Sequence, residues 1–208
     1  MRWSRIERDL RAQGHELIAG VDEVGRGPLA GPVVACAVIM PPGARAISGV
    51  ADSKALSGLQ RRRLAPMIRT RAVAWALGAA SVREIERLNI LAATCLAIRR
   101  AVERLPSRYD VVLLDGRPLA GLGIAHTAVV DADARCYSVA CASIVAKVVR
   151  DRLMTSLADR HPGYGWERNA GYGTAAHLAG LRRLGSTAHH RALFCATALS
   201  DGRVSSAV

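Results

Sequence analysis

The chain has 208 residues, half of them hydrophobic, which suits one domain with a substantial buried core and excludes a disordered protein. Its formal charge of +12 favours a polyanionic partner such as nucleic acid; a generally basic protein with no such partner is the alternative. Arginine supplies nearly all of the positive charge. The two lysines, Lys54 and Lys147, therefore mark positions where a compact ammonium suits better than a planar guanidinium.

The cysteines and the N-terminus bear on where the protein acts. The five cysteines are odd in number and form no C-x-x-C pair, so they indicate buried residues of a reduced compartment rather than a zinc site or a disulfide framework. Residues 1–11 are too charged for a signal peptide. The longest uncharged run, residues 28–44, holds four prolines and is too short and broken to span a bilayer. We expect a cytoplasmic, soluble monomer that makes no membrane contact.

The first half of the chain predicts three strands and two helices. Two β-branched runs, residues 17–24 and 33–40, predict strands joined by a loop rich in glycine and proline. Residues 72–80 are a third strand candidate. A capping box formed by Ser81 and Glu84 predicts that a helix begins there, and a longer helix is expected over residues 90–105.

The second half alternates between strands and helices. Residues 109–114 are a short apolar run typical of a strand buried on both faces, and a weaker strand is expected over residues 127–130. A long helix is predicted over residues 137–158 and a last helix after Thr174. This order predicts an α/β fold, in which a mixed sheet is flanked by helices and followed by a helical C-terminal extension.

The chain is expected to form a single domain over residues 1–208. Within it we expect an α/β core over about residues 14–160, a helical extension over about residues 161–195 and a flexible tail over residues 196–208.

Acidic residues lie at the ends of the predicted strands. Asp22 and Glu23 close the first strand, Asp115 closes the strand over residues 109–114, and Asp133 stands just before the long helix. Ligand sites of open α/β sheets gather at the carboxyl ends of strands. Because converging carboxylates repel one another, the pattern favours a site for hard divalent cations, Mg²⁺ or Mn²⁺.

Each of these acidic residues also has a structural interpretation. Asp22 and Glu23 could equally form a solvated strand end, and neighbours on a strand share a site only where the strand ends or bends. Asp115 followed by glycine is by itself commoner as a turn, and Asp133 could cap the following helix. Spacing does not rank three further acidic residues below these, namely Asp110, Asp131 and Asp151.

Several blocks of sequence, in order along the chain, resemble the type 2 ribonuclease H (RNase HII) family of bacterial type. The blocks are G-V-D-E-V-G-R-G-P-L-A-G-P-V-V from Gly20, D-S-K from Asp52, N-I-L-A-A-T from Asn89, L-L-D-G from Leu113, the segment from Asp133 to Arg152, G-Y-G-T from Gly171 and H-R-A-L-F from His190. They cover most of residues 18–194, and the ordered set is highly specific.

The resemblance implies a ribonuclease H-like fold and a two-metal-ion endonuclease. Such an enzyme cleaves the RNA strand of RNA–DNA hybrids and nicks 5′ of ribonucleotides embedded in duplex DNA, leaving 5′-phosphate and 3′-hydroxyl ends. Its role is to remove misincorporated ribonucleotides and RNA primers. The resemblance assigns catalysis and the binding of two Mn²⁺ or Mg²⁺ ions to Asp22, Glu23, Asp115 and Asp133. One ion would be held mainly by Asp22, Glu23 and Asp133, and the other near Asp22 and Asp115.

Asp133 is preferred to Asp131 because it stands in the family register, ten residues before Ser143. The chain departs from the family here, since Asp131 and Ala132 replace the usual Lys-Gly pair. This exchange places a negative charge near the predicted metal site without displacing a ligand.

The resemblance also implies the substrate contacts. Gly25, Arg26 and Gly27 match a motif whose backbone touches the ribonucleotide 2′-hydroxyl and phosphate, and glycine permits such close approach. A tight strand-ending loop is the alternative. Tyr172 matches a tyrosine that packs on the deoxyribose at the RNA-to-DNA junction. Lys54 is expected at a backbone phosphate, and Asn89 at the nucleic acid.

Four other residues have structural explanations that are at least as good. Lys147 can form an i,i+4 ion pair with Asp151. His177 and His190 are expected to be hydrogen-bonded structural histidines more often than phosphate contacts. Core packing is the better explanation of two aromatic residues, Tyr164 and Trp166.

Two other functions fit part of the pattern. A junction-resolving nuclease of similar fold also gathers carboxylates at a sheet edge, but it does not account for the Gly-Arg-Gly motif together with Tyr172. A non-catalytic nucleic-acid-binding protein would explain the charge alone. The tail from Cys195 shows no aromatic clamp-binding motif. The expected partners are therefore RNA–DNA hybrids and ribonucleotide-containing duplex DNA.

Overall fold

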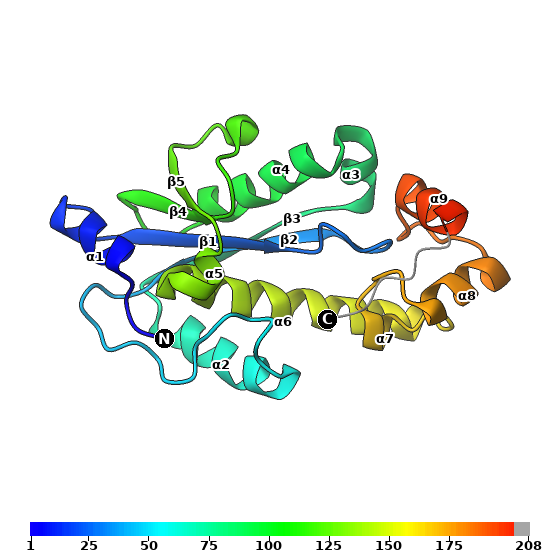
Figure 1. Cartoon of the computed structure of the whole chain (residues 1–208), viewed down its shortest axis with the longest axis horizontal. Coiled ribbons are helices and arrows are strands. Elements are labelled where there is room, and N and C mark those ends of the chain that lie inside the picture. Colours follow the sequence, from blue (N-terminus) through cyan, green and yellow to red (C-terminus); the bar gives the residue numbers. More distant parts are fainter. Residues whose placement is uncertain (202–208) are drawn as a thin grey trace.

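The computed structural model describes residues 1–201, and its centre is a five-stranded mixed sheet in the order β3-β2-β1-β4-β5 (Figure 1). The strands are β1 Ile18–Val24, β2 Val33–Ile39, β3 Ala74–Ala80, β4 Val111–Asp115 and β5 His126–Val129. The five strands predicted from the sequence are confirmed, with ends that differ by no more than two residues from those expected.

The pairing of the strands brings three carboxyl ends to one edge of the sheet. β2 runs antiparallel to β1 and β3, whereas β4 is parallel to β1 and β5 is parallel to β4. A short loop joins β1 to β2, while the parallel strands need longer connections. Val21 pairs with Leu114. The next residues along these neighbouring strands are Asp22 and Asp115, so the register alone sets two of the predicted carboxylates side by side.

Helices cover both faces of the sheet, α3 and α4 on one face and α6 and α2 on the other (Figure 1). The helices are α1 Arg5–Ala12, α2 Gly58–Arg71, α3 Val82–Leu88, α4 Ile90–Glu103, α5 Ala132–Arg135, α6 Tyr137–Arg160, α7 Trp166–Asn169, α8 Ala175–Leu184 and α9 Ala192–Asp201, with a short 3₁₀ turn, η1, at Ala120–Leu122. α7 and α8 lie near the C-terminal end of α6, and α9 lies beyond the end of the sheet, beside α3 (Figure 1).

The helices expected from the sequence are confirmed as α3, α4, α6 and α8, and Ser81 and Glu84 form the predicted capping box. Three helices of eight or more residues were not predicted, namely α1, α2 and α9, and α9 includes residues 196–201, where a flexible tail was expected. α1 and α2 also begin with capping boxes, at Ser4 and Ser57, but α2 contains Pro66, which normally argues against a helix interior. Residues 192–201 form α9; the rest of the segment predicted as a tail, residues 202–208, lies outside the described residues.

α6 packs directly on β1 because Gly20 has no side chain. A Cβ placed on Gly20 would overlap the backbone of Ser138 in the first turn of α6. The same turn is capped by the buried carboxylate of Glu7, which accepts hydrogen bonds from the backbone N–H groups of Tyr137 (3.1 Å) and Ser138 (2.8 Å). α1 and β1 therefore fix the position from which α6 carries its side chains along the sheet.

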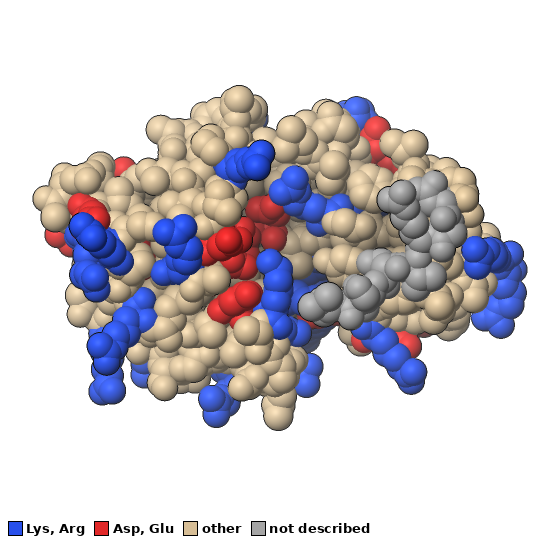
Figure 2. Space-filling view, in the orientation of Figure 1, with Lys and Arg blue, Asp and Glu red and all other residues tan. Residues whose placement is uncertain are grey.

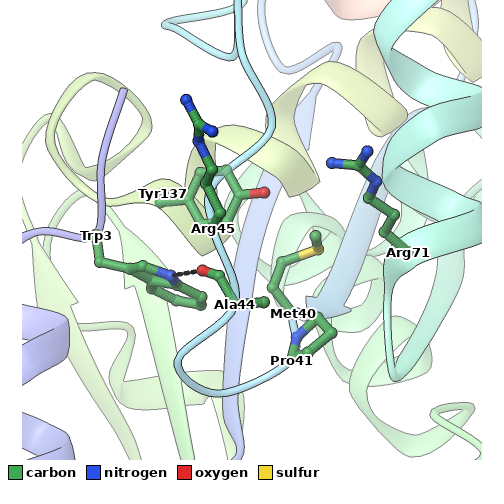
Figure 3. A pocket seen from close by; sticks show the side chains of 7 residues that line it. All are labelled: Trp3, Met40, Pro41, Ala44, Arg45, Arg71 and Tyr137. Carbon is green, nitrogen blue, oxygen red and sulfur yellow. Dashed lines mark hydrogen bonds between the residues drawn. The ribbon is translucent and has the colours of Figure 1, made fainter.

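The N-terminal segment is anchored at the end of β1 opposite to Asp22. Trp3 packs edge-on against Tyr137, with ring centroids 4.9 Å apart, and its indole N–H donates to the carbonyl oxygen of Ala44 at 2.7 Å (Figure 3). These contacts border a pocket of about 260 Å³ that Arg45 and Arg71 also line (Figure 3). No carboxylate of the described residues lines this pocket.

The five cysteines are buried and carry free thiols, as expected from the sequence. None of the helices within residues 1–201 is both long enough and apolar enough to cross a membrane.

Replacing Gly20 with Ala should lower the free energy of unfolding by about 1–3 kcal/mol, because the added methyl group forces α6 away from β1. Gly58→Ala is the control: at the first position of α2 a Cβ meets only the ends of arginine side chains, and the change should be neutral or slightly stabilising. Urea unfolding measures both. Equal stability of Gly20→Ala and the wild type would show that this close approach does not constrain the fold.

Candidate active site

A cleft of about 500 Å³ lies where β1 and β4 end. Three of the predicted carboxylates, Asp22, Glu23 and Asp115, line it together with both lysines of the chain. The remaining lining residues are Val24, Arg26, Ser53, Ser143 and Tyr172. Figure 2 shows acidic side chains gathered near the middle of one face, with basic side chains around them. The cleft therefore combines carboxylates with the cations that a phosphate backbone would meet.

Asp22 occupies the most enclosed position in the cleft. Its side chain is 7% exposed and lies on the α6 face of the sheet, the face to which Gly20 also belongs. Burial raises the pKa of Asp22 well above its usual value, the charge of Glu23 raises it further, and a hydrogen bond from Ser143 opposes the rise. Asp115 and Asp133 add smaller repulsions. The ionised form of Asp22 is thus disfavoured by its surroundings.

Glu23 reaches the cleft although strand alternation directs it toward the opposite face from Asp22. It lines the cleft and also a neighbouring groove of about 880 Å³ on the α4 side of the sheet. The Arg26 guanidinium contacts its carboxylate at 3.2 Å. Burial raises the pKa of Glu23, Arg26 lowers it in part, and Asp115 raises it again. β1 continues through both residues and ends at Val24, before Gly25 with φ +96°, so Glu23 lies one residue before the strand end.

Asp115 connects the sheet to the short helix that carries Asp133. One of its carboxylate oxygens accepts hydrogen bonds from the backbone N–H groups of Ala132 (2.6 Å) and Asp133 (3.4 Å). Burial raises the pKa of Asp115, and the charge of Asp133 raises it further. The Asp133 side chain is itself buried, at 5% exposure of the residue. The four predicted acidic residues therefore form one electrostatically coupled group.

The structure also separates the acidic residues that spacing could not rank. Asp110 accepts a hydrogen bond from the backbone of Leu17, just ahead of the start of β1 and at the opposite end of that strand from Asp22. Asp151 pairs with Lys147 at 2.8 Å, which confirms the expected i,i+4 ion pair. Asp131 is solvent-exposed, whereas Asp133, which was preferred because of the family register, is buried.

The chemistry of this donor set fits hard divalent cations, because all four side chains offer carboxylate oxygens. As the side chains stand, no three acidic, histidine or cysteine groups within residues 1–201 enclose one metal position. The ammonium of Lys54, 3.4 Å from Asp133, and the guanidinium of Arg26 supply the nearest positive charge instead. Burial alone would lower the pKa of Lys54, but the surrounding carboxylates, Asp133 foremost, outweigh it and raise the pKa. Divalent cations held by Asp22, Glu23, Asp115 and Asp133 would supply this positive charge in place of Lys54 and Arg26.

The glycine loop and Tyr172 lie beside the carboxylates. Gly25 has φ +96°, which favours glycine, and both Arg26 and Gly27 are exposed. A Cβ on Gly27 would be 3.7 Å from the Tyr172 ring, so the loop and the half-buried ring are direct neighbours. Asn89 lies apart from this cleft, in the groove on the α4 side. Its side-chain oxygen caps α4, accepting from the N–H groups of Leu91 and Ala92.

The interpretations of the remaining candidates as structural residues are confirmed. His177 and His190 are buried and hydrogen-bonded to each other at 3.1 Å. Tyr164 and Trp166 belong to the hydrophobic core of the C-terminal region. Three residues near the cleft were not predicted: Ser143 beside Asp22, and two buried arginines, Arg150 and Arg191, under the glycine loop. All three lie within the quoted sequence blocks, but nothing in the pattern gave them a role.

The comparisons with known proteins agree with one another. The family described as Ribonuclease HII matches residues 19–197. The Ribonuclease HII of Granulibacter bethesdensis is 55% identical over 194 residues, covering 91% of this chain and 87% of that protein. The Ribonuclease HII of Ruegeria pomeroyi is 53% identical over 191 residues, covering 91% and 81%.

Solved structures share the fold at low sequence identity. The ribonuclease H2 of Pyrococcus horikoshii OT3 superposes with a TM-score of 0.70 at 23% identity, covering 88% of this chain and 97% of that one. Bst-RNase HIII, solved in complex with Mn²⁺, superposes with a TM-score of 0.71 at 21% identity, covering 92% and 72%. The ribonuclease H-like fold expected from the sequence is confirmed.

Fold, site and relatives together define the class: this is a ribonuclease H, an endonuclease that degrades RNA in RNA–DNA hybrids. The chain belongs to the ribonuclease HII family.

Replacing Asp22 with Asn should raise the melting temperature in metal-free buffer at pH 7. Its raised pKa means that the charged form destabilises the fold, and Asn keeps the oxygen that accepts from the Glu23 N–H. A gain of about 1 kcal/mol corresponds to roughly 2–4 °C. Mn²⁺ should stabilise the wild type more than the variant. Differential scanning calorimetry measures both effects, with Asp159→Asn, an exposed site on α6, as the control. A lower melting temperature for Asp22→Asn without metal would contradict the inferred repulsion.

Proposed function

We propose that this enzyme cleaves the RNA strand of hybrids and also nicks duplex DNA on the 5′ side of a single embedded ribonucleotide, leaving 5′-phosphate and 3′-hydroxyl ends. The observation that carries the proposal is that one cleft is lined by the carboxylates Asp22, Glu23 and Asp115, by the exposed loop residue Arg26 and by Tyr172. A cation site and a sugar-contacting surface would therefore act on the same nucleotide.

The carboxylates Asp22, Glu23, Asp115 and Asp133 would hold two divalent cations, Mn²⁺ or Mg²⁺. When bound, such a pair supplies an activated water and stabilises the departing 3′-oxygen. The donor chemistry and the raised pKa values of Asp22, Glu23 and Asp115 support this assignment, because ionised carboxylates here need positive charge. A protein of the same fold was solved with Mn²⁺. Lys54 would then leave Asp133 for a substrate phosphate.

The loop and the ring would distinguish the two sugars at an RNA-to-DNA junction. The backbone N–H groups of Arg26 and Gly27 have no hydrogen-bond partner within residues 1–201, so they can donate to a 2′-oxygen or a phosphate. The Tyr172 ring beside Gly27 would pack on the following deoxyribose, where a 2′-hydroxyl would crowd it. In this proposal Tyr172 belongs to a C-terminal extension, about residues 161–195, that forms one wall of the substrate groove.

The biological role that follows is the removal of misincorporated ribonucleotides and RNA primers by a cytoplasmic monomer. Five buried, unpaired cysteines support a reduced compartment. Lys54, Arg26 and the overall charge of +12 support binding to a phosphate backbone, and Asn89 is a further candidate contact from the α4 side of the groove.

A DNA duplex with one embedded ribonucleotide tests the proposal directly. The wild-type protein should nick it on the 5′ side of the ribonucleotide with Mn²⁺, and leave it intact with a chelator or when the ribose is replaced by deoxyribose. Asp22→Asn should reduce the rate by well over ~100-fold, since even outer-shell partners of metal ions contribute ~10–100-fold, while binding of the duplex persists. Asp159→Asn should match the wild type. Wild-type cleavage by Asp22→Asn would refute the assignment.

Substitution of Tyr172 tests the role of the ring. Tyr172→Ala should lower kcat/KM on the single-ribonucleotide duplex by roughly tenfold or more, because one stacked ring contributes about 1–3 kcal/mol. The loss on a uniform hybrid should be smaller. Tyr172→Phe is the matched control, since it keeps the aromatic face and should restore most of the rate. If Tyr172→Ala lowered kcat/KM equally on both substrates, the ring would have no part in junction recognition.

A further inference from the structure

The glycine loop rests on a buried guanidinium that has no carboxylate partner. Arg191 is fully buried and donates to the carbonyl oxygens of Gly25 (2.6 Å), Arg26 (2.8 Å) and Gly31 (2.7 Å). It forms no salt bridge with any acidic residue in the described part of the chain. Burial lowers the pKa of Arg191 to about 9, so it stays a cation at neutral pH. The carbonyl groups of the loop are therefore its hydrogen-bond partners there, and the centroid of the Phe194 ring lies 5.3 Å from the guanidinium carbon.

A second buried guanidinium links this loop to the segment that carries Tyr172. Arg150 donates to the carbonyl oxygens of Ala30 (3.0 Å), Pro32 (3.0 Å) and Ala170 (2.8 Å). The carbonyl groups of Gly25 and Arg26 turn inward to Arg191, and the backbone N–H groups of Arg26 and Gly27 have no partner within residues 1–201. A planar guanidinium with five donors can hold several carbonyl groups at fixed angles, which an ammonium cannot.

A chain of hydrogen bonds connects His190, the residue before Arg191, to Tyr172 through His177. The His177 Nδ1–H donates to the Tyr172 carbonyl oxygen (2.9 Å), which leaves its Nε2 to accept from Trp166 (3.0 Å) and from the Nε2–H of His190 (3.1 Å). His190 Nδ1 accepts from the N–H of Thr187 (2.9 Å). In this proton assignment both rings are neutral; the Trp166 N–H and His190 share the His177 Nε2 acceptor, and the Thr187 N–H and hydroxyl share His190 Nδ1.

Both histidines are kept neutral by their surroundings. Burial lowers the pKa of His190 to about 4, and neighbouring His177, His189 and His161 contribute to the fall. Burial also lowers the pKa of His177. Since both pKa values are depressed, the neutral pair persists as the pH rises and is lost only as the pH falls below the ordinary histidine range toward 4. The chain of hydrogen bonds is therefore intact at neutral pH.

We propose that the adjacent pair His190 and Arg191 sets the spacing between the glycine loop and Tyr172, and thereby determines the preference for a ribonucleotide followed by a deoxyribonucleotide. Arg191 fixes the loop that would meet the 2′-hydroxyl, and His190, through His177, fixes the backbone of the residue that would meet the next sugar. They are positioning residues, because neither lines the cleft. The inference deepens the proposed function and rests on it.

Two substitutions of His190 separate this role from a general structural one. His190→Gln places an amide N–H where Nε2–H stood and keeps the link to His177, whereas His190→Asn keeps the acceptor for Thr187 and breaks that link. The measurement is the ratio of kcat/KM on a single-ribonucleotide duplex to that on a uniform hybrid. His190→Asn should lower the ratio on the order of tenfold, mainly through kcat, and His190→Gln should keep it within about twofold. Equal ratios for the two variants would overturn the proposal.

Arg191→Lys tests the other half of the pair. It keeps the charge but loses the fork that spans three carbonyl groups, and the ratio should again fall on the order of tenfold. Arg182→Lys, an exposed arginine of α8, is the control and should leave the ratio unchanged. If Arg191→Lys lowered kcat/KM on both substrates by the same factor, or on neither of them, the arginine would not set the spacing.

Failure of the proposed function can be distinguished from failure of this inference about spacing. It would appear as a wild-type protein that does not nick the single-ribonucleotide duplex. The spacing is then tested without cleavage, by hydrogen exchange of the Gly31 and Tyr172 amides, which donate to the carbonyl oxygens of His189 and Asn169. Exchange should accelerate in Arg191→Lys and His190→Asn but not in His190→Gln. Unchanged exchange in the first two variants would overturn the inference by itself.

Discussion

Repulsion among four carboxylates at one edge of a sheet is the constraint on which this site depends. Asp22 and Asp115 are neighbours because the parallel register of β1 and β4 makes them so, and the N–H groups that Asp115 holds fix the start of α5 with Asp133. Burial and mutual charge raise the pKa of Asp22, Glu23 and Asp115. Local cations, Lys54 and Arg26, lie against this group, and α6 packs closely on β1 beside it. Electrostatic strain at a site of this kind is typical of groups that act on a ligand.

A different principle governs the substrate side of the cleft. There, positive charge is buried rather than negative charge, and the carbonyl groups of the loop are the partners of Arg150 and Arg191. Residues far apart in sequence thus meet in one network: the loop after β1, the long helix α6 and the segment before α9. In the proposed function the carboxylates would act, through divalent cations, on the phosphodiester, whereas this network would arrange the groups that recognise the sugar.

Much of the fold follows from sequence pattern alone. The β-branched runs of β1 and β2 and the apolar run of β4 predicted strands because such runs bury both faces of a strand. α2 was not predicted; its interior contains Pro66, which disfavours a helix, although a capping box at Ser57 begins it. The carboxylates were identifiable since strand ends and the family blocks both pointed to them. Arg191 was not, because in a chain so rich in arginine no local pattern distinguishes a buried guanidinium from an exposed one. Its partners lie more than 150 positions away, and only the folded chain shows them.

The central claim is that hard cations relieve the repulsion of this carboxylate group. Its most direct test is a titration of Mn²⁺ into the protein, with an uncleavable hybrid bound, following the free-ion signal by electron paramagnetic resonance. The account predicts saturable binding of two ions per chain, with spectral coupling between ions ~3.5–4 Å apart, and loss of that coupling in Asp115→Asn. Weak, unsaturable binding that is the same in the wild type and in a protein lacking all four carboxylates would contradict it.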